Sequence, residues 1–469
     1  MGKDIYLIGI CGTGVGALAG LLKAQGHRVR GSDVHAYPPM SDKLREWGIP
    51  VLEGFDAAHL TPKPDLVIIG NVVRASNPEA VAVRDQGIPH MSMPQAIAEF
   101  GIGDKHSIVI AGTHGKTTTS ALAAHVLMHA GRDPGYLVGG ALVGYSESFR
   151  AGRGGGFVIE GDEYDTAYFD KGPKFMHYRA RSAVITSLEF DHADIFADIG
   201  AVEKAFAGLI RTVPADGHII VWHGADRARR LIREGAKAKR ITTYATRKTE
   251  GANLWLESFT SGPQGLTFKP VYDGKALGEM TVPLWGEFSA ANVLAVIGAL
   301  RDASLTPDEL RAGFASFAGV RRRLELRAEP GGVAIVDDFA HHPTAVDVTL
   351  EAARTRWPRR RIWALFEPRS ATSRRNVFQQ EFVTAFAKAD RVIIASHERL
   401  SEIAAGERFD PQQLAYDIMG KGVPARFIES VDTIADTVAA EAKAGDVVMV
   451  FSNGAFGGLH EKLIERLSK

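Results

Sequence analysis

Short apolar runs alternate with amphipathic stretches from the start of the chain. Residues 4–9 and 65–70 are apolar runs that end in glycine, and residues 27–33 have the pattern of a strand that ends in Asp33. A helical pattern through Leu18, Leu21 and Leu22 lies between the first two of these strands in sequence order. Strands that alternate with helices predict a parallel, doubly wound sheet, whose ligands bind at the carboxyl ends of the strands.

The alternation continues in two further blocks. The second block has predicted strands at residues 107–111, 157–160, 182–186 and 218–222, then antiparallel strands within 246–274 and a helix over 286–301. The third block has predicted strands at residues 332–336, 361–366, 391–395 and 446–451. The pattern therefore predicts an α/β protein of three domains, with limits near residues 1–104, 105–325 and 326–469.

Composition narrows the class of protein. The 469 residues, 45% apolar and 23% charged, are typical of a soluble globular protein with two to four domains. Basic and acidic side chains number 55 each, which gives no reason to expect a nucleic-acid partner. The single cysteine, Cys11, excludes an intrachain disulfide and fits a cytoplasmic protein. The uncharged stretch 6–22 is glycine-rich and short for a span, so we expect no membrane insertion.

The loop at residues 112–117 carries the strongest chemical motif. It follows a predicted strand and opens a predicted helix, so its glycines let backbone N–H groups converge on phosphate oxygens at a helix N-terminus. Lys116 can neutralise β- and γ-phosphates, and the Thr117 hydroxyl suits Mg²⁺. The spacing is two residues shorter than that of the common phosphate loop, so an ordinary glycine turn is the alternative.

A second glycine-rich turn lies at the start of the chain. Gly9, Gly12, Gly14 and Gly16 are followed by Asp33 after roughly twenty residues. The spacing differs from the dinucleotide fingerprint, and it favours pyrophosphate binding at a helix N-terminus. A structural turn and an NAD-dependent oxidoreductase are the alternatives.

Acidic and basic clusters follow the phosphate loop. Carboxylates within residues 160–165 and 188–194, together with His192, are the groups that a second Mg²⁺ needs; solvated acidic turns are the alternative. Residues 321–325 and 337–343 lie around the second domain boundary. An arginine there can reach a transferring phosphoryl group when domains close, and a surface charge cluster is the alternative.

Taken in order, these motifs resemble the Mur ligase family of ATP-dependent amide-forming enzymes, over essentially the whole chain. The resemblance implies Rossmann-like first and third domains and a central P-loop ATP-binding domain. Segments 188–196, 367–370 and 452–454 are most similar to the branch that joins UDP-N-acetylmuramate to the L-alanyl-γ-D-glutamyl-meso-diaminopimelate tripeptide in peptidoglycan recycling. The branch that adds L-alanine in the de novo pathway is one alternative. A nucleotide-binding module without catalysis, which would need no metal site, is another.

The resemblance also implies roles for single residues, with ATP as co-substrate and two Mg²⁺ ions. Catalysis would involve Lys116, Arg323 and His192, and the metal ligands would be Thr117, Glu160 and His192. ATP would be bound by Gly112, Thr113, His114, Gly115, Lys116, Thr117, Asn292 and Asp338. The UDP substrate would be bound by Gly12, Gly14, Gly16 and Asp33, and the peptide by Glu367, Arg369 and Asn453.

The adenine segment departs from the family pattern. Where the family usually has histidine and asparagine, this chain has Phe288 and Ser289. A phenylalanine ring can still stack on adenine, whereas serine lacks the amide of asparagine. The departure bears on ATP affinity more than on the class of reaction.

Overall fold

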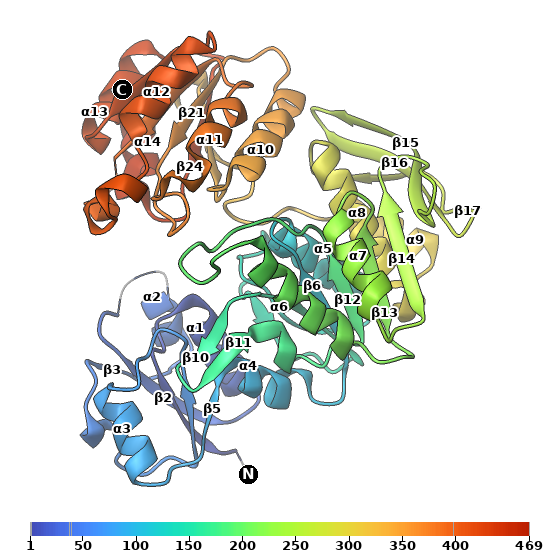
Figure 1. Ribbon diagram of the computed structural model, residues 1–469, viewed down its shortest axis with the longest axis vertical. Coiled ribbons are helices and arrows are strands. Elements are labelled where there is room, and N and C mark those ends of the chain that lie inside the picture. Colours follow the sequence, from blue (N-terminus) through green and yellow to red (C-terminus); the bar gives the residue numbers. More distant parts are fainter. Residues whose placement is uncertain (1, 37, 39, 397, 469) are drawn as a thin grey trace.

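The computed structural model describes residues 2–36, 38, 40–396 and 398–468. Three lobes follow one another along the chain, with the N-terminal and C-terminal lobes at opposite ends and the central lobe between them (Figure 1). The mixed α/β architecture with parallel sheets confirms the predicted fold class. Among the described residues, no helix has both the length and the apolar character that crossing a bilayer requires.

The first domain has a parallel sheet of order β3-β2-β1-β4-β5. Its strands are β1 Asp4–Ile8, β2 Arg28–Asp33, β3 Val51–Glu53, β4 Leu66–Ile69 and β5 His90–Ser92. Its helices are α1 Thr13–Ala24, α2 Met40–Glu46, α3 Pro78–Asp85 and α4 Met93–Ala96. Every residue of β1 is buried, as expected for the central strand of a sheet covered on both faces. The strand order reverses at β1, so the loop after β1 lies at the crevice where such sheets bind ligands.

The central domain has a larger sheet of order β17-β16-β15-β14-β13-β12-β6-β9-β7-β8, with β18 paired to β16. The strands from β15 to β7 are parallel, and a long antiparallel hairpin of β15 and β16 extends the sheet. The strands are β6 His106–Ala111, β7 Gly135–Leu137, β8 Phe149–Arg150, β9 Gly156–Gly161, β12 Ser182–Ile185, β13 His218–Trp222, β14 Arg240–Ala245, β15 Leu254–Gly262, β16 Gly265–Tyr272, β17 Lys275–Ala276 and β18 Met280–Val282. A separate hairpin consists of β10 Asp165–Ala167 and β11 Asp170–Pro173.

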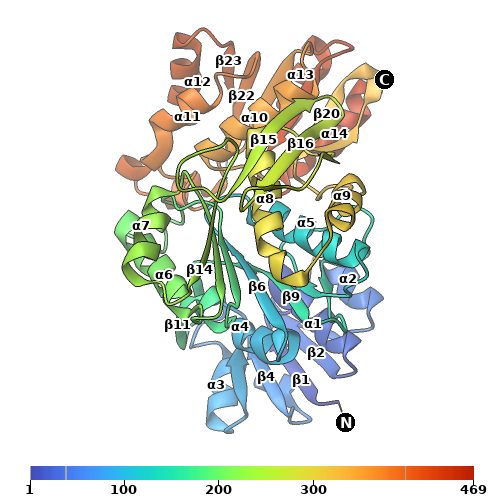
Figure 2. The same ribbon diagram turned by 90° about the vertical axis from the view of Figure 1, so that its right-hand side faces the viewer.

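Helices cover both faces of the central sheet (Figure 2). They are α5 Lys116–His129, α6 Ile199–Thr212, α7 Asp226–Gly235, α8 Glu287–Ala299 and α9 Pro307–Ala315. Helices α5, α8 and α9 pack together on one face, and α6 and α7 pack together on the other. Helix α8 lies within the predicted range 286–301 and is almost wholly buried after its first turn, which explains its small apolar residues.

The third domain has a sheet of order β19-β20-β24-β21-β22-β23, in which β19 is antiparallel to β20 and the other pairs are parallel. The strands are β19 Glu325–Ala328, β20 Ala334–Asp338, β21 Ile362–Phe366, β22 Arg391–Ala395, β23 Ala425–Ile428 and β24 Val447–Phe451. The helices are α10 Pro343–Arg356, α11 Gln379–Ala385, α12 Pro411–Gly420, α13 Val431–Glu441 and α14 Leu459–Leu467.

Two kinds of junction connect the domains. The first and central domains share one apolar core, in which the Trp47 and Phe149 rings meet edge to face at 5.2 Å. The third domain contacts the central domain through separate cationic and apolar contacts: the Arg356 guanidinium lies 3.9 Å from the Trp285 ring, which also packs against the apolar core of the third domain. The loop at residues 112–117 lies at this second junction, where Arg323 contacts Thr117. The residue limits predicted for the domains stay a prediction.

Candidate active site

The phosphate loop joins β6 to α5 at the centre of the largest sheet. Gly112 and Gly115 both have positive φ, at 133° and 82°, a conformation that residues with a Cβ rarely adopt. A Cβ on Gly112 would lie 2.1 Å from Thr186 Oγ1, so the loop closes tightly against the end of β12. Lys116 is the first residue of α5, and its ammonium donates to Gly112 O at 2.6 Å.

Buried carboxylates surround Lys116. Its Nζ lies 3.3 Å from Glu163 Oε2, and Glu160 at the end of β9 accepts hydrogen bonds from Thr117 Oγ1 (3.0 Å) and Gly139 N (2.6 Å). Burial opposes the charged form of Lys116, but Glu163, Asp162 and Glu160 outweigh it and raise the pKa of Lys116. Burial, together with Asp162, raises the pKa of Glu160. The corner therefore concentrates negative charge around one ammonium group, which favours additional cations.

Oxygen atoms suited to Mg²⁺ are present in this corner. The Thr117 hydroxyl and the Glu160 carboxylate are hard ligands of the kind that Mg²⁺ prefers, and they are already in contact. His192 has φ of 54°, and its Nε2 lies 3.6 Å from Glu163 Oε1. Glu163 therefore links Lys116 to His192. The sequence includes Glu163 among the carboxylates of residues 160–165 but does not single it out, although its position three residues after Glu160 is a signal.

Arg323 reaches the phosphate loop from the domain boundary. Its guanidinium donates to Thr117 Oγ1 at 3.3 Å and lies 5.1 Å from the Phe339 ring. The linker is bent, because Arg322 and Leu324 on either side have φ of 60° and 48°. Asp338 fixes the bend by accepting the backbone N–H groups of Leu324 (2.7 Å) and Ala340 (2.9 Å). Burial raises the pKa of Asp338.

The predicted adenine segment lies beside the same loop. A Cβ on Gly115 would meet Asn292 Oδ1 at 2.7 Å and Phe288 Cζ at 3.2 Å. Asn292 is buried in the first half of α8, and Phe288 is half-buried. The structure thus brings the two residues to this loop from about 175 positions further along the chain.

The glycine turn of the first domain has different neighbours. Gly12 is the N-cap of α1, and the Asp33 carboxylate accepts the backbone N–H groups of Cys11 (2.9 Å) and Val34 (2.8 Å). A Cβ on Gly14 would lie 3.2 Å from Met93 Sδ, and a Cβ on Gly16 would lie 2.3 Å from Met40 Sδ. Gly14 and Gly16 therefore allow close packing against methionines, whereas Gly12 and Asp33 shape the loop itself.

The residues predicted for peptide binding lie together at the carboxyl ends of β21 and β24. Glu367 accepts from Ser452 Oγ at 2.5 Å, and Ser452 Oγ accepts from Gly454 N at 2.9 Å. The Arg369 guanidinium packs directly over Gly454. Asn453 Oδ1 is buried and has no hydrogen-bond partner among the described residues, so it is available to a ligand.

A polar contact joins this region to the loop that carries His192. Thr372 Oγ1 donates to Asp191 Oδ1 at 2.8 Å and accepts from Ala193 N at 3.2 Å. Burial opposes ionisation of Asp191, but the neighbouring His192 and the hydrogen bond from its backbone N–H outweigh it and lower the pKa of Asp191. A cavity of about 320 Å³ lies next to this contact and is lined by residues of both domains: Phe190, Ala193, Phe196, Ala197, Arg375, Asn376, Val377 and Glu407.

Comparisons with known proteins agree along the whole chain. Family models described as the Mur ligase family catalytic domain, the Mur ligase middle domain and the Mur ligase glutamate ligase domain match residues 4–103, 110–300 and 322–454. The UDP-N-acetylmuramate–L-alanyl-γ-D-glutamyl-meso-2,6-diaminoheptandioate ligase of Escherichia coli K12 is 40% identical, over 99% of this chain and 98% of its own. The UDP-N-acetylmuramate–L-alanine ligase of Desulfitobacterium hafniense is 32% identical, over 99% of this chain and 100% of its own. A crystal structure of a murein peptide ligase from Psychrobacter arcticus superposes with a TM-score of 0.74 at 32% identity, covering 100% of this chain and 99% of that one.

Proposed function

The chain belongs to the Mur ligase family, and from this premise we propose that it joins UDP-N-acetylmuramate to the tripeptide L-alanyl-γ-D-glutamyl-meso-diaminopimelate, using ATP. One observation carries the proposed reaction: the hydroxyl of Thr117 contacts both Glu160 and Arg323, so groups from three segments converge beside the phosphate loop. The choice of the tripeptide rests on the 40% identity to the Escherichia coli ligase, against 32% for the L-alanine ligase.

The reaction needs activation of a carboxylate, because a carboxylate oxygen is a very poor leaving group. Transfer of the γ-phosphoryl group of ATP to the lactyl carboxylate of the muramate gives an acyl phosphate and ADP. The neutral α-amine of the peptide then attacks the carbonyl carbon and loses a proton. The tetrahedral oxyanion collapses to the amide and releases inorganic phosphate.

Two cationic side chains would stabilise the negative charge that develops on the phosphoryl group. Lys116 would neutralise the β- and γ-phosphate oxygens from the first turn of α5, and Arg323 would approach the γ-phosphate from the domain boundary. Both are already oriented by protein contacts, so little reorganisation accompanies the reaction. Asn292 and Phe288 would bind the adenine beside Gly115, and Asp338 would bind the ribose.

Mg²⁺ fits the oxygen atoms of the same corner. We propose two ions, one held by Thr117 and one by Glu160 and His192, with Glu163 close to the second. Bound Mg²⁺ supplies positive charge that screens the phosphoryl oxygens from the acyl oxygens. The raised pKa of Glu160 supports this assignment, because a buried carboxylate without a full counter-charge favours a cation.

The peptide is proposed to bind between the central and third domains. Segment 188–196, which is similar to the tripeptide branch, contacts the third domain through Asp191 and Thr372, two residues beyond the second such segment, 367–370, and beside the cavity of about 320 Å³. The buried, unpaired Asn453 Oδ1 and the exposed Arg369 offer an acceptor and a cation for an anionic, amide-rich peptide. The UDP moiety would bind at the Gly12 turn, and we place the reaction in the cytoplasm.

Product identification by mass tests the proposal. Purified protein is incubated with ATP, Mg²⁺ and UDP-N-acetylmuramate, and L-alanine and the tripeptide are offered in separate reactions. A tripeptide adduct with an equal amount of ADP is expected. An L-alanine adduct alone would assign the chain to the other branch. The absence of any adduct, or a nicotinamide-dependent reaction instead, would contradict the ligase assignment.

A further inference from the structure

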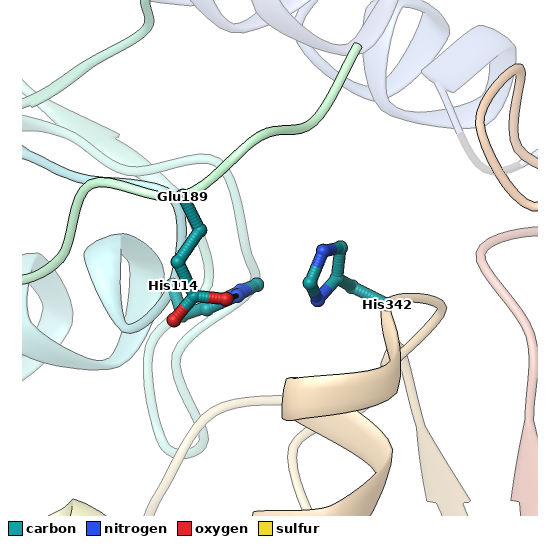
Figure 3. Close-up of side chains that lie close together, drawn as sticks. All are labelled: His114, Glu189 and His342. Atoms are coloured by element: carbon teal, nitrogen blue, oxygen red, sulfur yellow. Dashed lines mark hydrogen bonds and ion pairs between the residues drawn. The ribbon is translucent and has the colours of Figure 1, made fainter. Parts of the chain in front are cut away.

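Two imidazoles and one carboxylate converge at the junction of the central and third domains, apart from the residues assigned to Mg²⁺. His114 belongs to the phosphate loop, Glu189 follows β12, and His342 is the N-cap of α10 (Figure 3). One ligand atom of each lies within 4.8 Å of the others, and among the described residues this is the one such group of three. Figure 3 shows the three side chains pointing toward one another.

The distances are close to those of a coordination sphere. Two ligands that each bind a metal at about 2.0–2.2 Å lie roughly 3–4 Å apart. His114 Nε2 is already 3.3 Å from Glu189 Oε2, and the ring centroids of His114 and His342 are 4.7 Å apart. Thr344 Oγ1 donates to Glu189 Oε2 at 2.8 Å and so holds this carboxylate in place. To complete the site, one ring nitrogen of His342 would exchange its present contact, with Thr344 N or with Phe190 O, for the metal.

Metal binding would replace a hydrogen bond that two of the side chains make now. His114 Nε2 and Glu189 Oε2 are hydrogen-bonded at 3.3 Å. A metal ligand must carry a free lone pair, so binding would displace a proton from an imidazole nitrogen.

We propose that His114, Glu189 and His342 bind a divalent transition-metal ion of the Zn²⁺ class, which ties the third domain to the phosphate loop and competes with ATP. Two imidazoles and one carboxylate favour Zn²⁺, Co²⁺ or Ni²⁺ over Mg²⁺, which prefers oxygen ligands. The competition follows from the position of His114, between Thr113 and Gly115 in the loop that would receive the phosphates. This last step rests on the proposed function, whereas the metal site itself does not.

The metal site is tested on the full-length, tag-free protein without nucleotide or Mg²⁺. Co²⁺ is the probe, because its visible absorption reports histidine ligation and distorted geometry. We expect one equivalent of Co²⁺ to bind with such a spectrum and Zn²⁺ to displace it. His342→Asn should weaken Co²⁺ binding at least about tenfold, because a ligand is lost. Asparagine is among the best N-cap residues, so this variant preserves the start of α10 and should fold.

Matched variants separate this site from its neighbours. Thr344→Val removes the hydrogen bond to Glu189 but leaves all three ligands, and it should bind Co²⁺ at least as tightly as the wild type. Glu160→Gln should leave the spectrum and affinity unchanged. Equal Co²⁺ affinity in the wild type and His342→Asn would overturn the site, as would a Co²⁺ spectrum that depends on Glu160 instead. A wild type that binds no Co²⁺ would also overturn it.

Competition with ATP is measured separately. Adding ATP with excess Mg²⁺ should release the bound Co²⁺ from the wild type, detected as loss of the visible bands. Co²⁺ that stays bound at saturating ATP would contradict the proposed competition with ATP, but it would not contradict the metal site. Because Co²⁺ binding is read without substrates, failure of the ligase reaction and failure of the metal site are distinguishable.

Discussion

In the first domain, β1 leads through Gly9 and Gly12 into α1, and in the central domain β6 leads through Gly112 and Gly115 into α5. The backbone plan is the same, yet the side chains differ. The α1 corner is bordered by methionines, the Asp33 carboxylate and a buried Cys11, whose pKa burial raises to about 11. In the α5 corner the Lys116 ammonium contacts the buried carboxylate of Glu163, and the Thr117 hydroxyl contacts both the half-buried Glu160 and the Arg323 guanidinium.

The difference separates binding from catalysis. Backbone N–H groups and a helix dipole hold an anionic group equally well before and during a reaction, which gives affinity without rate. Charged side chains that are fixed where charge changes stabilise the transition state more than the substrate. We therefore expect substitutions at the α5 corner to lower kcat and substitutions at the α1 corner to raise the KM for the UDP substrate.

Lys116→Ala is the strongest test of this contrast. Loss of the ammonium should lower kcat by about 10²–10³-fold, because one preorganised charge of the phosphoryl-transfer site is removed. Initial rates at saturating substrates measure the effect. Lys239→Ala, which removes an exposed lysine of the same domain, is the control. A thermal melt checks folding, because Glu160 and Glu163 lose their cation, and a folded Lys116→Ala protein with unchanged turnover would contradict the site assignment.

Arg323→Ala should have the next largest effect. Its guanidinium reaches Thr117 only from the domain boundary, so we expect a fall in kcat of about 10²-fold with little change in the KM for the UDP substrate. Arg321→Ala is a matched control, because Arg321 is two residues away, exposed and paired with Glu325. Equal losses of kcat in both variants would show that these arginines act through general surface charge.

The sequence predicts those parts of this contrast whose pattern lies within one short segment of the chain. Buried apolar strands such as β6, β12 and β13 were predicted nearly at their observed limits, and the glycine loops that follow them were recognised. Strand β14 was missed, because its sequence is largely polar and its first two residues are exposed. Strand β3 has three residues and little burial, too few to give a pattern.

Contacts between distant segments could not be predicted in the same way. The contact of Thr372 with Asp191 joins residues 181 positions apart, and that of Thr344 with Glu189 joins residues 155 apart. Hydroxyl and carboxylate groups have many polar alternatives, so nothing local selects these partners. The place of residues 321–325 at the domain boundary indicates an arginine that can reach a phosphoryl group, and the resemblance to a known family selects Arg323. Its contact with Thr117 was not predicted. The role of Glu163 between Lys116 and His192 emerged from the structure.

Glycine-to-alanine substitutions, each of which adds a single Cβ atom, test the two glycine loops in the same way. Gly115→Ala should weaken ATP binding about tenfold, since a positive φ costs about 1–2 kcal/mol and the Cβ would lie 2.7 Å from Asn292 Oδ1. Gly12 has φ of −65°, and a Cβ there would lie 3.5 Å from Gly9 O, so the fold should tolerate Gly12→Ala. The KM values for ATP and for the UDP substrate are measured in both variants. A larger effect of Gly12→Ala on ATP than on the UDP substrate would reverse the assignment of the loops.

The smallest expected effect concerns pH. His342 is surrounded by Glu189, Asp191, His114 and His341, and burial with His114 lowers its pKa from 6.5 to about 4. Between these values the unfolded chain binds a proton that the folded protein excludes, so stability should fall as pH decreases from 6.5 toward 4. His342→Asn should reduce the slope of stability against pH by the equivalent of up to about one bound proton. Thermal midpoints measured across this pH range check the change. UDP affinity should change less over the same range, because the groups proposed to bind it at the α1 corner are backbone N–H groups. An identical pH slope in the wild type and the variant would show that His342 is not the group that titrates. The α5 corner would then differ from the α1 corner in catalysis but not in its response to pH.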